Sequence, residues 1–116
     1  MALSKDQIFG AADSDVIEID IPEWGGSIKL KPMTGEQRAG YEFWAATASK
    51  KNSDFRGIRE RTIIACAVDD AGEPLFTADD LATLAKKNAA VLDRLSVECQ
   101  RISGLLADDV EEAAKN

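Results

Sequence analysis

Residues 16–31 have the sequence Val-Ile-Glu-Ile-Asp-Ile-Pro-Glu-Trp-Gly-Gly-Ser-Ile-Lys-Leu-Lys, and this stretch decides the fold. Apolar and charged residues alternate on both sides of a segment that contains Pro22, Gly25 and Gly26. Alternation with a period of two is typical of a strand with one buried face, and proline and glycine are turn residues. We therefore predict an antiparallel β-hairpin at about residues 16–31.

The two predicted strands can be aligned so that both faces match. This register pairs Ile21 with Ile28, Asp20 with Lys29, Ile19 with Leu30, and Glu18 with Lys31. Apolar pairs then share one face and opposite charges share the other, as stable cross-strand pairs do. Because an isolated hairpin is only marginally stable, its apolar face must be covered by helices.

The remaining sequence predicts those helices. Apolar residues recur at helical spacing at about residues 35–48, 54–68, 78–86 and 89–103. The residues that precede these segments, Thr34, Asp54, Thr77 and Asn88, are all types that cap a helix N-terminus. Ser4 and Gln7 form a capping box for one shorter helix, and residues 69–74 form an exposed turn.

These elements define the predicted fold class. We expect an α+β fold, with residues 1–104 forming a mostly helical single domain that has one N-terminal antiparallel β-hairpin. Residues 105–116 hold four acidic residues and one lysine, so we expect an acidic flexible C-terminal tail.

The overall composition excludes several classes of function. The chain has 116 residues, 14 basic and 21 acidic, and a formal net charge of −7. This charge disfavours nucleic acids and anionic membranes as partners. The longest apolar run, residues 63–68, is far shorter than the roughly 20 residues that span a bilayer. The N-terminus lacks a hydrophobic signal segment, so we expect a cytoplasmic protein.

Catalytic, cofactor and metal sites are not predicted. The chain has no histidine, which removes the commonest general base and metal ligand. Pairs of adjacent acids lie at expected turns and caps, where solvated side chains are the ordinary interpretation. Cys66 and Cys99 each lie within an apolar helical pattern, so we expect buried free thiols rather than a disulfide. The sequence thus indicates a protein that is not an enzyme.

Three aromatic residues are candidates for partner binding. Trp24 lies in an otherwise polar turn, and Phe43 and Trp44 are neighbours on one predicted helix, where both cannot occupy the centre of one face. Core positions would explain all three. The functional interpretation is that one or two of them anchor an interface, because tryptophan is enriched at such positions.

A set of short segments carries a family resemblance across nearly the whole chain. In order and spacing, these segments resemble landmarks of the tail assembly chaperones of long, non-contractile-tailed phages and prophages. They are Ala-Leu-Ser-Lys-Asp-Gln-Ile-Phe at 2–9, Ile-Pro-Glu-Trp-Gly-Gly at 21–26, Met-Thr-Gly-Glu-Gln-Arg at 33–38, Gly-Glu-Pro-Leu-Phe-Thr-Ala-Asp-Asp-Leu at 72–81, Ala-Val-Leu-Asp-Arg-Leu at 90–95 and Ile-Ser-Gly-Leu at 102–105.

The resemblance implies a function without implying any site. It implies a non-enzymatic cytoplasmic protein of the bacterial host cell that helps the tape measure protein and tail tube subunits assemble and is absent from the finished virion. It further implies homo-oligomers, and a longer frameshift variant that recruits tube subunits. We expect self-association to involve a hairpin edge or the helix at about 35–48. The family has no catalytic residues to carry over.

The last three residues bear on the frameshift. Codons GCA, AAA and AAC for Ala114, Lys115 and Asn116 would contain the slippery sequence A-AAA-AAC. The nucleotide sequence decides this point directly.

Two other classes stay open at the level of sequence. One is a small structural head–tail adaptor or tail terminator, which would be present in purified virions. The other is an acidic regulatory interaction module, which would range its acids along one exposed face. Here the acids cluster instead at caps, turns and the tail.

Overall fold

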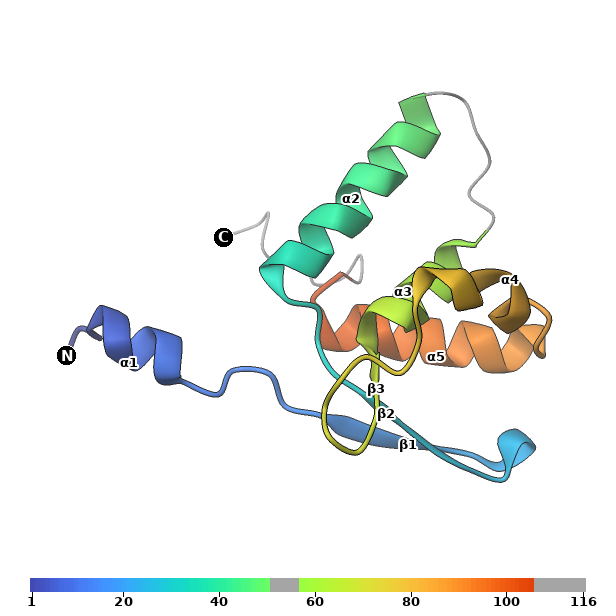
Figure 1. Cartoon of the computed structure of the whole chain (residues 1–116), viewed down its shortest axis with the longest axis horizontal. Helices are drawn as coiled ribbons and strands as arrows, with labels where there is room; N and C mark the ends of the chain where they lie inside the picture. Colours follow the sequence, from blue (N-terminus) through green and yellow to red (C-terminus); the bar gives the residue numbers. More distant parts are fainter. Residues whose placement is uncertain (51–56, 106–116) are drawn as a thin grey trace.

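The computed structural model describes residues 1–50 and 57–105, shown in Figure 1. It has a mostly helical α+β fold with an N-terminal antiparallel hairpin, as predicted, and a short third strand. The helices are α1 (Lys5–Gly10), α2 (Gly35–Lys50), α3 (Ile58–Cys66), α4 (Leu81–Leu84) and α5 (Ala89–Ile102). The strands are β1 (Ile17–Ile21), β2 (Gly26–Leu30) and β3 (Ala67–Val68), and the 3₁₀ helices are η1 (Pro22–Trp24) and η2 (Ala78–Asp80).

The hairpin is confirmed, but its predicted register is wrong by two residues. Ile21 pairs with Gly26 and Ile19 with Ile28, so the loop has four residues and not six. The cause is η1, which is closed by Gly25 in the left-handed region at φ 75° and by a hydrogen bond from the Gly25 N–H to the Pro22 carbonyl. Glycine adopts this conformation without steric cost.

A shift of two residues preserves which face each side chain occupies. The predicted apolar face is therefore confirmed, with Ile21, Ile28 and Leu30 buried. The predicted charge pairs change, because Lys29 lies opposite Glu18 and its Nζ pairs with Asp70 at 3.1 Å. Glu18 Oε2 accepts a hydrogen bond from Ser27 Oγ at 2.6 Å.

The third strand corrects the prediction of a helix over 54–68. That helix ends at Cys66, and residues 67–68 pair with Leu30 and Lys29 of β2. The free edge of β2 offers unpaired backbone groups, and satisfying them in the sheet replaces the last half-turn of helix. The helix begins at Ile58 after Gly57, and the predicted cap Asp54 lies outside the described residues.

The other predicted helix starts are confirmed. Ser4 with Gln7 and Thr34 with Gln37 form reciprocal capping boxes. The Asn88 side chain accepts hydrogen bonds from the backbone N–H groups of Ala90 and Val91. The segment after Thr77 is a 3₁₀ turn that continues into α4 and ends at Leu84, two residues earlier than predicted.

The core lies between the hairpin, α3 and α5. α5 places four apolar side chains in it, and α3 adds two across the helix pair. These and the hairpin residues form one cluster: Ile21, Ile28, Leu30, Ile63, Cys66, Ala67, Leu84, Val91, Leu92, Leu95 and Cys99. Both cysteines are free and buried, as predicted.

Two helices lie largely outside this core. α1 buries no residue, and Figure 1 shows it apart from the other elements, at the end of an extended segment. α2 rises away from the α3–α5 pair in the same view, and none of its residues 35–47 is fully buried. The predicted acidic tail lies outside the described residues from 106 onward.

Candidate interaction surfaces

Trp24 stands at the tip of the hairpin beside an apolar groove. Trp24 is the last residue of η1 and is 36% exposed. The groove has a volume of about 260 Å³, and we call it the Trp24 groove. Its lining comes from the hairpin tip and from residues 76–87, which include α4: Trp24, Phe76, Asp80, Thr83, Leu84 and Lys87. It is a concave apolar surface with one acid and one base, the form that receives a bulky side chain.

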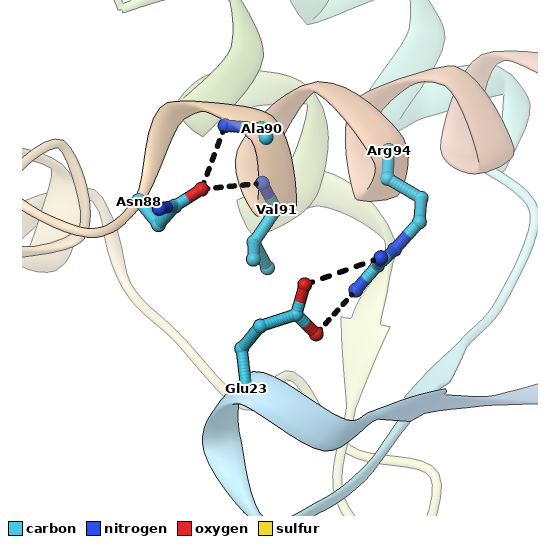
Figure 2. A network of polar contacts seen from close by, with 5 residues as sticks. All are labelled: Glu23, Asn88, Ala90, Val91 and Arg94. Carbon is cyan, nitrogen blue, oxygen red and sulfur yellow. Dashed lines mark hydrogen bonds and ion pairs between the residues drawn. The ribbon is translucent and has the colours of Figure 1, made fainter.

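An ion pair fixes the hairpin tip against α5. The Arg94 guanidinium donates to both carboxylate oxygens of Glu23, with Nη2 to Oε1 at 2.9 Å and Nη1 to Oε2 at 3.4 Å (Figure 2). These hydrogen bonds lower the pKa of Glu23 below its ordinary value of 4.5. Figure 2 also shows the Asn88 cap at the N-terminus of the same helix. The ion pair therefore connects the hairpin tip to α5.

Trp44 lies in a different place, in a cleft between α2 and α3. Its ring is 4.7 Å from the Arg61 guanidinium carbon and 6.2 Å, centroid to centroid, from the Tyr41 ring. Such a cation over an indole face is attractive. The cleft has a volume of about 190 Å³ and is lined by these residues with Gln37, Gly40, Ile64, Ala65, Ala78 and Leu81. Trp44 thus connects α2 to the body of the protein.

Phe43 projects from α2 into solvent and is 75% exposed. The three aromatic residues singled out from the sequence therefore lie at three separate positions, and the structure does not bring them together. Trp24 borders the groove at the hairpin tip, Trp44 lines the α2–α3 cleft, and Phe43 is exposed on α2.

The sequence analysis missed a further apolar surface at the N-terminus. Leu3, Ile8 and Phe9 are 66%, 53% and 78% exposed. We call residues 1–16 the N-terminal arm. The capping box of Ser4 and Gln7 predicts the helix but does not predict what covers its apolar residues. The structure shows that no other element among residues 1–50 and 57–105 covers these side chains.

The buried Cys99 thiol is not suited to nucleophilic chemistry. A hydrogen bond with Cys66 and burial both raise the pKa of Cys99, which favours the thiol over the reactive thiolate. Cys66 Sγ also lies 3.7 Å from Ser103 Oγ, which accepts a hydrogen bond from the Met33 N–H. Within residues 1–50 and 57–105, no cluster of three acidic or cysteine side chains could hold a metal ion. The same ranges contain no helix long and apolar enough to cross a membrane.

The fold matches a solved structure of known function. The structure of the bacteriophage HK97 tail assembly chaperone aligns with a TM-score of 0.56, over 88% of this chain and 92% of that chain. The two sequences are 18% identical over the alignment, so the likeness lies in the fold. No protein-family model matches the sequence, and no curated protein does. The resemblance to tail assembly chaperones found in the sequence is therefore confirmed at the level of the fold.

Proposed function

We propose that this chain is a phage tail assembly chaperone that binds the tape measure protein and helps recruit tail tube subunits. The observation that carries the proposal is the shared fold with the HK97 tail assembly chaperone over nearly the whole length of both chains. The sequence landmarks that resemble this family support it independently, because they were identified without the structure.

The distribution of apolar surface supports a binding role. The described residues include nine large apolar side chains that are exposed, and eight of them lie on the N-terminal arm, the hairpin tip, α2 and the loop before η2. A chaperone for a long helical protein needs apolar surface to cover the apolar stripes of its partner. The net charge of −7 per copy keeps such a complex soluble.

The candidate anchors are Trp24, Phe43 and Trp44, and their surroundings in the structure differ. Trp24 and Phe43 present apolar surface without any rearrangement, whereas Trp44 would bind through the cleft that it shares with Arg61. A few anchors on separate surfaces suit a contact that must later be released to the tail tube. We further propose that copies of the chain associate, and that a longer frameshift variant contacts the tube protein.

Co-expression with the cognate tape measure protein tests this function. We expect that protein to remain soluble and to co-purify with the wild-type chain, and to precipitate without it. Trp24→Ala and Phe43→Ala each reduce recovery of the complex. Val97→Ala is the matched control, because Val97 is 49% exposed on α5 and lies outside the proposed anchors.

The outcomes of this experiment test the proposed chaperone function and the assignment of the anchors separately. If the tape measure protein is equally soluble with and without this chain, the proposed function is wrong. If the chain solubilises its partner and the Trp24→Ala and Phe43→Ala variants do so equally well, the function stands and the assignment of these two anchors is wrong. Mass spectrometry of purified virions separates a chaperone from a structural tail component, which would be abundant there.

A further inference from the structure

The N-terminal arm concentrates apolar surface that its own chain does not cover. Five of the nine exposed large apolar side chains among the described residues lie on it: Met1, Leu3, Ile8, Phe9 and Val16. The rest of the described chain, more than five times as long, holds the other four. Apolar surface at this density marks a contact with another molecule.

The helix of the arm also needs an external surface. α1 has only six residues and buries none of them, and a helix this short is marginal in water even with good caps. The capping box of α1 preforms the helix. Leu3 and Ile8 add to this, because their positions match those of a hydrophobic staple. Phe9, in the last turn of the helix, remains the most exposed of its apolar side chains.

The Trp24 groove offers the complementary surface. An apolar cavity of about 150 Å³ can hold a benzene ring, and the groove has about 260 Å³ between Trp24, Phe76 and Leu84. It can therefore receive the Phe9 ring.

The geometry makes this contact intermolecular. β1 carries the chain away from the arm and toward the tip, so α1 lies beyond one end of the hairpin and the groove lies beside the other (Figure 1). The arm of one copy thus extends away from its own groove, and a second copy supplies the groove that it can reach.

Charge favours this contact over the alternative at the hairpin edge. Each copy carries a charge of −7, so association needs surfaces without an acidic excess. α1 has one base and one acid, Lys5 and Asp6, and the groove has Lys87 and Asp80. In contrast, the charged residues of β1 are both acids, Glu18 and Asp20, and pairing the β1 edges of two copies would bring like charges together.

We propose that the N-terminal arm of one copy docks on a second copy and inserts Phe9 into its Trp24 groove. The inference deepens the self-association part of the proposed function and rests on it. The arm and the groove are different surfaces, so each copy offers one of each, and either can be disabled alone.

A complementation experiment with two full-length variants tests the pairing. Phe9→Asp disables the arm, and Thr83→Arg fills the groove from an exposed position on α4. Light scattering at high micromolar concentration should give the wild type a mass above that of one chain, and each variant alone the mass of one chain. An equimolar mixture of the two should give a species of twice that mass, because the intact arm of the Thr83→Arg copy fits the intact groove of the Phe9→Asp copy.

The controls make each result decisive. Val97→Ala should associate like the wild type, and circular dichroism should give both disabled variants the wild-type fold, because neither residue is in the core. If either variant still associates like the wild type, or if the folded variants do not complement each other, the arm–groove contact is wrong while self-association stands. If the wild type itself remains a single chain, both are wrong.

Discussion

α5 and α1 are both well capped at their N-termini, but they differ in how much of each helix is buried. Both begin at a side chain that accepts hydrogen bonds from backbone N–H groups, Asn88 in α5 and Ser4 in α1. α5 then buries five residues, whereas α1 buries none. Local sequence therefore determines where each helix starts, and burial determines which of them contributes to stability. The apolar residues that folding leaves uncovered on α1 remain available for binding.

The largest effect should come from removing core volume in α5. Leu95 is fully buried in the core cluster, so Leu95→Ala should lower the free energy of unfolding by about 2–5 kcal/mol. Urea denaturation measures the change. Val97→Ala, two residues along the same helix and half exposed, should change it by less than about 0.5 kcal/mol. Equal effects for both variants would contradict the placement of the core.

The two helix caps give a matched comparison of intermediate size. Asn88→Ala removes the acceptor of two backbone N–H groups in a helix of the core and should cost about 1 kcal/mol in global stability. Asn88→Asp keeps an acceptor and should lose less.

Ser4→Ala removes the equivalent acceptor from α1. Because α1 buries no residue, the global urea midpoint should not move, and only hydrogen exchange of the α1 amides should become faster. A loss of global stability equal to that of Asn88→Ala, at a concentration where the chain is a single copy, would show that α1 packs on the core of its own chain.

The smallest effect concerns the exposed ion pair between the hairpin tip and α5. Because the folded-state pKa of Glu23 is lowered, its contribution to stability is complete above the ordinary value of 4.5 and is lost as the pH falls through the folded value. Arg94→Ala should raise the titration midpoint of the Glu23 carboxyl, measured by NMR, and Arg38→Ala should leave it unchanged. An unmoved midpoint in Arg94→Ala would mean that the pair does not persist in solution.

The sequence was sufficient where one local interaction decides the structure. The alternation at 17–21 and 26–30 predicted the hairpin and its buried face, and side-chain caps predicted the starts of α1, α2 and α5. It failed where competing local patterns had similar energies. Residues 67–68 continue a helical pattern as well as they form a strand, and the free edge of β2 selects the strand.

The candidate interaction surfaces also include some features that the local sequence predicts and others that only the structure reveals. Trp24 could be identified as a turn aromatic from its neighbours alone, and its ring does border a groove. The separate settings of Phe43 and Trp44 depend on where α2 lies relative to α3, which no local pattern specifies. The uncovered state of Leu3, Ile8 and Phe9 also required the structure, because an apolar residue in a capped helix has the same sequence signature whether or not a neighbour covers it.

By itself, the amino-acid sequence specified the α+β class, the face of each strand and the residue at which most helices begin. These features depend on side-chain periodicity and on hydrogen bonds between residues a few positions apart. Tertiary structure alone decided the third strand, the groove beside Trp24 and the solvent exposure of the N-terminal arm. These depend on which surfaces distant segments leave for one another, and that is a property of packing rather than of any single stretch of chain.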